Sequence, residues 1–131
     1  MLGPYVEIAA FCEEVVEEED GCVSLKHVSD RTEAWVDRAT GARVLGGTVY
    51  LGVRSGDLSG PHTVHIALLD PIGRVAFETD PLPAQFEGGL SGVHLQMRFQ
   101  GSADNDGIYW FEIFLDKSTA PLFRWPLQVG P

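Results

Sequence analysis

An unbroken alternation of apolar and polar residues occupies positions 93–100, where the sequence is Val-His-Leu-Gln-Met-Arg-Phe-Gln. Successive side chains of a β-strand point to opposite faces, so this period of two predicts a strand with one buried and one solvated face. Further out, alternation recurs at 64–69 and 75–78, on either side of the turn sequence Asp70-Pro71-Ile72-Gly73. Pro at the second turn position and Gly at the fourth suit a type I turn closed by a left-handed residue. The sequence therefore predicts a β-hairpin over residues 62–79.

Three further regions have strand patterns. Residues 5–16 are predicted to form a first strand, to which 22–29 returns antiparallel. Residues 43–54 form another, in which Gly46-Gly47 marks either a bulge or the true start of the strand. Residues 108–116 and 122–129 are predicted to form a last hairpin across 117–121.

About eight strands joined by short turns, within 131 residues, indicate an all-β protein with a single domain over residues 1–131. We expect one antiparallel β-sandwich, with Ig-like or C2-like topology as the nearest analogies. Two segments interrupt the pattern. Asp30-Arg31-Thr32-Glu33 has the spacing of a helix capping box, so 30–40 is either one short helix or an irregular loop, with Trp35 as a buried anchor in both cases. Residues 80–92, rich in Pro and Gly, are predicted to be a surface loop.

The net charge of −10 is concentrated near the N-terminus. The first twenty residues contain seven acids and no Lys or Arg, whereas residues 21–131 hold twelve acids and nine bases. This balance argues against direct binding to nucleic acid, which needs clustered Lys and Arg. A run of like charges usually stays solvated, and the alternative is a docking surface for a basic partner or a metal. The densest acidic run comprises Glu13, Glu14, Glu17, Glu18, Glu19 and Asp20.

The sequence lacks the features of a membrane or secreted protein. No apolar run approaches the roughly 20 residues of a membrane helix, and residues 1–5 lack a basic segment followed by an apolar one. A hairpin closed at 17–21 would place Cys12 opposite a residue near Lys26 rather than opposite Cys22. Free thiols suit a reducing compartment, so we expect a cytoplasmic protein.

No catalytic or metal-binding motif is recognisable, and we expect neither enzyme activity nor a cofactor. His62 and His65 are three apart, so on one strand they point to opposite faces, and His94 is expected to be solvated. The sequence contains no Gly-x-Ser-x-Gly elbow and no phosphate-binding glycine loop. Residues 104–107, Asp-Asn-Asp-Gly, resemble part of a calcium loop but lack the downstream bidentate Glu, so a turn is the favoured interpretation.

The last hairpin is the predicted partner-binding site. If Tyr109, Phe111, Ile113 and Leu115 face the core, then the outward residues are Ile108, Trp110, Glu112 and Phe114. Pairing across 117–121 is expected to set Arg124 near Phe114 and Gln128 near Trp110. Aromatic residues and Arg are enriched at the centres of protein interfaces, so outward Trp and Phe side chains beside an Arg favour a binding surface. The alternative is that these rings are covered by segment 30–42 or 80–92 of the same chain. The predicted partner-binding residues are Trp110, Glu112, Phe114 and Arg124.

The N-terminal run Phe11-Cys12-Glu13-Glu14-Val15, followed by Gly21 and Val23-Ser24-Leu25, resembles the opening of a family of small uncharacterised bacterial proteins. Gly107-Ile108-Tyr109 and the closing Pro126-Leu127-Gln128-Val129 resemble the end of these proteins. The resemblance spans most of the chain and implies a compact β-sandwich domain. It implies no activity and no catalytic residue.

These observations leave three hypotheses for function. The leading one is a non-enzymatic binding or accessory module that docks a protein partner, or its own copy, through the outward aromatic strand. The alternative is that the acidic run mimics nucleic acid and binds a basic groove of a nucleic-acid-binding protein, acting as an inhibitor. An enzyme or a calcium-dependent module is the third.

Overall fold

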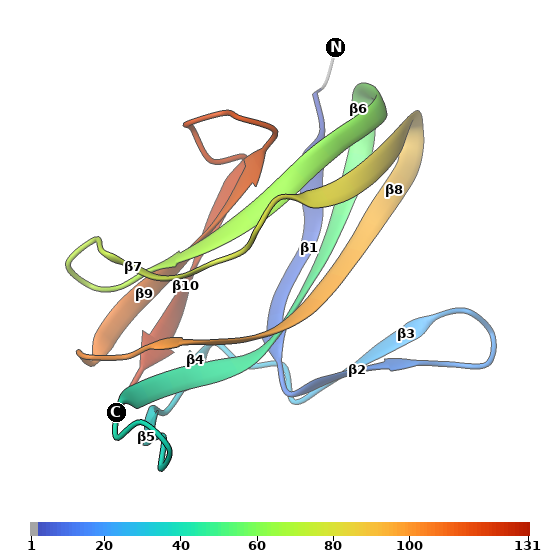
Figure 1. The fold of residues 1–131 in the computed structure, drawn as a ribbon. Coiled ribbons are helices and arrows are strands. Elements are labelled where there is room, and N and C mark those ends of the chain that lie inside the picture. The colour runs from blue at the N-terminus through green and yellow to red at the C-terminus, as the bar shows by residue number, and fades with distance from the viewer. Residues whose placement is uncertain (1–2) are drawn as a thin grey trace.

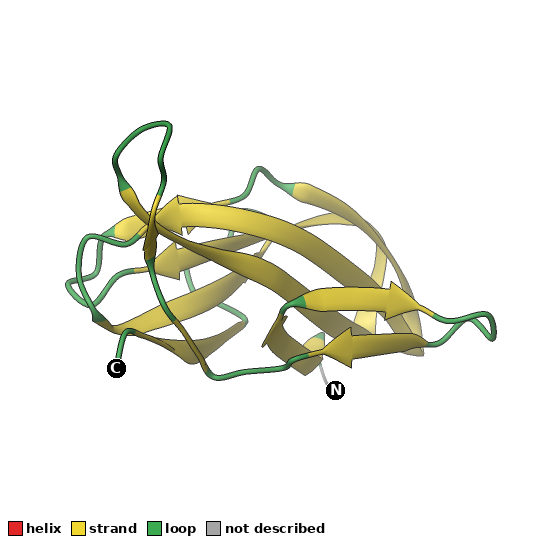
Figure 2. Cartoon of the chain, turned by 90° about the horizontal axis from the view of Figure 1, so that it is seen from below, coloured by secondary structure: helices red, strands yellow, loops and turns green. Residues whose placement is uncertain are grey.

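The computed structural model describes residues 3–131, and all of its regular structure is β-strand (Figures 1 and 2). The predicted all-β class is confirmed. No helix occurs between residues 3 and 131, so none long and apolar enough to cross a membrane is found in that range. The strands are β1 (Tyr5–Cys12), β2 (Glu14–Glu17), β3 (Val23–Lys26), β4 (Arg31–Thr32), β5 (Trp35–Val36), β6 (Arg43–Leu69), β7 (Val75–Glu78), β8 (Leu82–Ser102), β9 (Gly107–Leu115) and β10 (Phe123–Val129).

Eight of the strands form one curled sheet, and β2 and β3 form a separate two-stranded sheet. The main order is β1-β6-β9-β10-β4, with β5, β7 and β8 also paired to β6. All of these pairs are antiparallel except β10–β4, where Gln128 lies opposite Arg31 and Val129 opposite Thr32 in parallel. The sheet is therefore mixed, in contrast to the wholly antiparallel arrangement predicted.

The two longest strands, β6 and β8, bend together and give the sheet its curl (Figure 1). Their ladder runs from the Val44–Ser102 pair to the Val64–Leu82 pair, with register shifts on both sides of Gly56. Backbone angles φ of +57° at Gly56 and +79° at Gly88 lie in the left-handed region that glycine adopts without strain. The first half of β6 pairs with β1, and the second half pairs with β9.

This bent ribbon corrects two predictions. The strand beginning at Arg43 continues past residue 54 to Leu69, and 80–92 is not a surface loop because Leu82 onward belongs to β8. Ala84 and Phe86 are buried between exposed neighbours, which is the same period of two that identified 93–100. Gly88 and Gly89 mark a bend within this strand, whereas Pro81 precedes it and Pro83 lies near its start.

The core lies between the two halves of the curled sheet. Phe111 of β9 is fully buried, and its ring contacts Phe11 of β1 and Phe99 of β8, with centroids 6.3 and 5.7 Å apart. The buried residues of both halves of β6 belong to the same cluster. The predicted alternation at 93–100 is confirmed, because Val93, Leu95, Met97 and Phe99 pack against this core while the residues between them are exposed.

Gly46 and Gly47 are neither a bulge nor a strand start. β6 begins at Arg43, and its register with β8 is regular through both glycines. A Cβ atom at Gly46 would lie 2.5 Å from the carbonyl oxygen of Phe99, and one at Gly47 would lie 2.6 Å from the Phe11 ring. Glycine is needed here because neighbouring atoms approach the backbone closely.

The segment 30–40 forms no helix. The carbonyl of Asp30 accepts a hydrogen bond from the Gln128 N–H (2.9 Å), and Trp35 lies opposite Val44 in the β5–β6 pair. Trp35 is 46% exposed, so the prediction that it is a buried anchor is wrong. The helix that the capping-box spacing predicts does not form, because β10 and β6 offer hydrogen-bond partners to the backbone of this segment. A turn closed by Gly41 (φ +74°) then leads into β6.

The predicted hairpin around Asp70 is confirmed. Strands β6 and β7 pair antiparallel, and the Gly73 N–H donates to the Asp70 carbonyl across the turn (3.0 Å). Gly73 has φ +89°, as the turn sequence required. The Asp70 carboxylate accepts from the N–H groups of Ile72 (3.0 Å) and Arg74 (2.8 Å), which fixes the turn.

Candidate functional site

The outward-facing side chains of β9 and its neighbours form a partly exposed surface. Tyr109, Phe111 and Ile113 are fully buried, and the alternating residues point to the opposite side of the sheet, as predicted. Leu115 is partly buried and packs against the core. We call this surface the outer aromatic face, and define it as His65 of β6, Trp110, Glu112 and Phe114 of β9, and Arg124 of β10.

The pairing of the last hairpin differs by two residues from the prediction. Arg124 lies opposite Glu112 rather than near Phe114, and Gln128 lies opposite Ile108 rather than near Trp110. The β9–β10 ladder ends at the Phe123–Ile113 pair, next to which the Leu122 N–H donates to the Ile113 carbonyl (2.6 Å). The Asp116 N–H, beyond the end of β9, donates to the Thr63 carbonyl (2.7 Å) on the β6 side.

This register brings three of the four predicted residues into direct contact. The Arg124 Nε lies 3.0 Å from the Glu112 carboxylate, and its guanidinium carbon lies 4.5 Å from the centre of the Trp110 ring. The Glu112 side chain is only 15% exposed, so this ion pair is partly shielded from water. Arg124 is therefore held in one position over the indole by a charge pair and a cation–π contact.

Phe114, the fourth predicted residue, stacks on His65 rather than on Arg124. Their ring centroids are 4.7 Å apart and the planes differ by 11°. Trp110 and Phe114 are both partly exposed. The segments 30–42 and 80–92 contribute strands to the sheet instead of acting as free covering loops. His65 is not among the residues predicted from the sequence, although the alternation at 64–69 places it on the outward side of β6.

The predicted acidic run forms a hairpin that projects from the body (Figure 2). Its strands β2 and β3 pair only with each other among the described residues, and the turn is closed by the Asp20 carboxylate accepting from the Cys22 N–H (2.9 Å). Glu13 lies 3.3 Å from His27, and Glu14 lies 3.8 Å from Lys26. All six predicted acidic residues are exposed: Glu13, Glu14, Glu17, Glu18, Glu19 and Asp20.

The two cysteines are free, as expected from the hairpin register. Cys12 is buried opposite Thr48 of β6, and Cys22 is exposed beyond the acidic turn. Burial raises the pKa of the Cys12 thiol above its ordinary value.

His62, His94 and Asp106 each contact another polar group. His62 pairs with Asp116 (2.8 Å), and its other ring nitrogen lies 3.1 Å from the Ser59 carbonyl. His94 is exposed, and its Nδ1 contacts the Tyr50 hydroxyl. Residues 103–106 connect β8 to β9, and Asp106 pairs there with Arg43. Within residues 3–131, no three His, Cys, Asp or Glu side chains are grouped closely enough to bind a metal.

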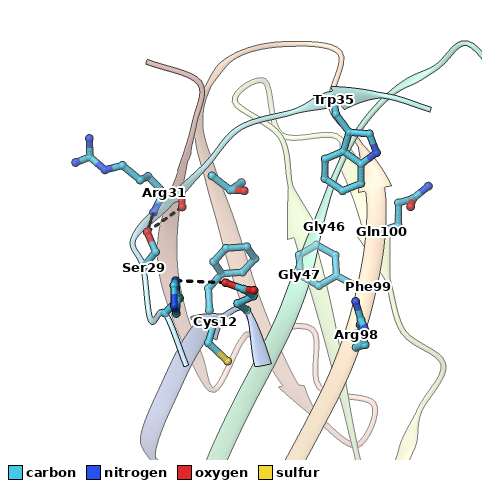
Figure 3. A pocket seen from close by; sticks show the side chains of 13 residues that line it. Cys12, Ser29, Arg31, Trp35, Gly46, Gly47, Arg98, Phe99 and Gln100 are labelled. Carbon is cyan, nitrogen blue, oxygen red and sulfur yellow. Dashed lines mark hydrogen bonds and ion pairs between the residues drawn. The ribbon is translucent and has the colours of Figure 1, made fainter. Parts of the chain in front are cut away.

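A cavity of about 400 Å³ lies where the segment after the acidic hairpin crosses β6 and β8 (Figure 3). Gly46 and Gly47 line it without side chains, and Trp35 stands at one end. Arg98 lies on the β8 side, whereas the Arg31 side chain points away from the glycines. This cavity could not be predicted from local sequence patterns, because it is assembled from segments far apart in the chain.

Comparison with known proteins adds no assignment to these surfaces. No family model matches the chain, and no curated protein matches it either.

Proposed function

We propose that this chain is a non-enzymatic protein-binding or accessory module that docks a protein partner, or a second copy of itself, through the outer aromatic face. The observation that carries the proposal is the fixed position of Arg124 over Trp110, held by Glu112. Trp, Tyr and Arg dominate the binding energy of protein interfaces, and a side chain that is already ordered loses less entropy on binding.

The proposal also covers the architecture of the domain and its cellular compartment. We infer that the two halves of the curled sheet act as the two layers of a β-sandwich, as in the bacterial family that the N-terminal run resembles. The contact of Phe111 with Phe11 and Phe99 across the core supports this arrangement. The buried free thiol of Cys12 supports a reducing compartment such as the cytoplasm.

The experiment compares the wild type with the Trp110→Ser, Phe114→Ser double variant. Sedimentation measures self-association, and affinity capture from the native host measures partner binding. The matched control is Leu90→Ser, which removes an exposed apolar side chain (79% exposed) from the β8 bend, away from the outer aromatic face. We expect the double variant to lose the association while the control keeps it, with both still folded by circular dichroism. A monomeric wild type whose captured proteins are identical to those of the double variant would overturn the proposal.

A second candidate is that the acidic hairpin binds a basic groove of a nucleic-acid-binding protein. The observation that favours it is that Glu17, Glu18, Glu19 and Asp20 form no ion pair with another described residue, on a hairpin that projects from the body. Such binding should weaken steeply with salt, because screening acts on exposed charges. Replacing Glu17, Glu18 and Glu19 with Gln should abolish it, and unchanged capture by this variant at low salt would exclude it.

A further inference from the structure

Two cavities that share Glu13 and Arg98 in their walls form one groove over β6 and β8. The first, of about 400 Å³, lies beside Gly46 and has Trp35 at one end (Figure 3). The second, of about 310 Å³, extends the groove to Gln96. Both volumes lie within the range of small-ligand sites, about 300–1,000 Å³. We call this space the Trp35 groove.

Trp35 supplies an aromatic surface at one end of the groove (Figure 3). The tip of its indole ring lies over Gly46, because a Cβ atom there would be only 3.3 Å from Trp35 Cη2. Nearly half of the residue is nevertheless exposed. Within residues 3–131, its ring forms no aromatic pair and no cation–π contact. The indole is therefore available to pack against the apolar side of a ligand.

β8 lines the groove with a row of three planar polar side chains, Gln96, Arg98 and Gln100. All three are exposed and alternate with residues that pack on the core, so they stand on one face of the strand, about 7 Å apart. Among the described residues, none of the three forms an ion pair or a side-chain hydrogen bond. The amides both donate and accept hydrogen bonds, and the guanidinium donates.

Glu13 and His27 form the wall on the side of the acidic hairpin. Nδ1 of His27 lies 3.3 Å from one carboxylate oxygen of Glu13, as the dashed line in Figure 3 marks. His27 has φ +55°, a conformation that is uncommon for residues other than glycine and that clusters at functional sites. The pair orients the Glu13 carboxylate and leaves its second oxygen as an acceptor.

The charges of the groove favour a neutral ligand. Arg98 and Glu13 line both cavities and their formal charges cancel, while the net charge of −10 repels anions from the molecule as a whole. Hydroxyl groups suit such walls, because each one can donate to Glu13 and accept from Arg98. A sugar ring combines such hydroxyl groups with a face of C–H groups that packs on an aromatic ring.

We propose that the Trp35 groove binds a neutral oligosaccharide. One sugar ring packs on Trp35, and the hydroxyl groups of the following rings bond to the polar row of β8 and to Glu13. A chain of sugars fits better than a single one, because the groove continues from Trp35 past Arg98 to Gln96. This inference goes beyond the proposed function and is independent of the outer aromatic face.

The test follows the indole N–H resonances of Trp35, Trp110 and Trp125 in the NMR spectrum of the whole chain, assigned with single Trp→Phe variants. The probes are neutral tetrasaccharides of glucose (α- and β-linked), mannose, xylose and N-acetylglucosamine. We expect at least one of them to shift the Trp35 resonance saturably, with a dissociation constant below about 1 mM. The resonances of Trp110 and Trp125, which lie outside the groove, should stay in place.

Calorimetry with the tetrasaccharide that binds then compares variants. Trp35→Ala should abolish binding, Trp35→Phe should keep part of it, and Arg98→Met should weaken it about tenfold. The matched control is Val36→Ala in the same strand β5, because Val36 is 61% exposed and does not line the groove. This control should keep the affinity within about twofold. Circular dichroism checks that all four variants remain folded.

Three results would overturn this inference. The first is a Trp35 resonance that no tetrasaccharide shifts at concentrations up to about 10 mM. The second is tighter binding of tetragalacturonate, the anionic probe of the same length, than of every neutral one. The third is unchanged affinity in folded Trp35→Ala. None of these readouts requires association through the outer aromatic face, so they fail or succeed separately from the proposed function.

Discussion

Nδ1 of His62 lies 2.8 Å from Oδ2 of Asp116, and this pair fastens the second half of β6 to the end of β9. Asp116 has φ +53°, a conformation uncommon for a residue other than glycine. Its other carboxylate oxygen accepts from the Thr63 N–H (3.0 Å), and its own N–H donates to the Thr63 carbonyl (2.7 Å). Three hydrogen bonds, all to His62 and Thr63, therefore hold Asp116 against β6.

The His62–Asp116 pair should make stability depend on pH. The hydrogen bond to Asp116 raises the pKa of His62, and the Thr63 N–H, followed by His62, lowers the pKa of Asp116. The stabilisation from His62 is complete below its unfolded pKa of about 6.5 and is lost as pH rises through its folded pKa. The stabilisation from Asp116 is complete above the pKa of about 3.9 that this carboxyl has in the unfolded chain, and it is lost as pH falls through the pKa in the folded protein. Denaturant unfolding should thus show the largest cost of His62→Gln between about pH 4 and pH 6.5.

The matched control for this pH dependence is His65→Gln. His65 stacks on Phe114 and forms no ion pair among the described residues. The loss of unfolding free energy caused by His65→Gln should vary less with pH than the loss caused by His62→Gln. Equal pH profiles for the two variants would show that the His62–Asp116 pair does not contribute to stability.

Gly46→Ala should destabilise the protein by about 1–3 kcal/mol, because its Cβ would clash with the Phe99 carbonyl oxygen, which the β6–β8 ladder holds in place. Gly52→Ala in the same strand is the control, since its Cβ would meet only atoms at 3.6 Å or beyond. Its effect should stay within about 1 kcal/mol of zero, because a compatible Gly→Ala change restricts the unfolded chain. Chemical denaturation of the two variants measures the difference, and equal costs would contradict the close approach at Gly46.

One of the two thiols should react rapidly in the folded protein. Cys22 is exposed, whereas Cys12 is buried and burial raises its thiol pKa, so both access and thiolate fraction disfavour reaction at Cys12. Titration with a chromogenic disulfide reagent should give one equivalent quickly and the second only in denaturant. The variant Cys22→Ser should give no rapid phase. Rapid reaction of both thiols in the wild type would mean that β1 opens readily from β6.

Arg124 and Trp110 should be energetically coupled, but only weakly. The Arg124 side chain is 48% exposed, so solvent screening limits the ion pair and the cation–π contact to a coupling of about 0.5–1 kcal/mol. A double-mutant cycle with Arg124→Met and Trp110→Leu, read by chemical denaturation, measures it. Arg124→Lys should recover only part of the coupling, because an ammonium lacks the planar fork that stacks on the ring. Additive single changes would show that Arg124 is not held over Trp110 in solution.

Local features of the sequence identified several elements correctly. The turn at Asp70–Gly73 and the faces of 93–100 and of β9 follow from turn chemistry and from the period of two, and both depend only on residues a few positions apart. The exposure of the acidic run is local in the same sense, because adjacent carboxylates favour water whatever the rest of the chain does.

The wrong predictions all concern relations between distant segments. Asp30–Thr32 has a helix-start pattern, but free edges of β10 accept it as a strand. Gly88 and Gly89 mark a bend within β8 rather than a loop, because β6 bends beside them. The pairing of Arg124 with Glu112 joins two strands across a connection whose path local rules did not give, and Asp116 in that connection is held by His62 and Thr63, more than fifty positions earlier.

The sequence alone therefore determined that the chain is all-β, where most of its turns lie and which side of each clear strand is buried. These properties arise from backbone geometry and side-chain polarity within a short window. Only the tertiary structure decided how strongly the sheet curls and which residues meet on the outer aromatic face. Those outcomes depend on strand register and on the pairing of edges, and both are set by contacts between residues far apart in the chain.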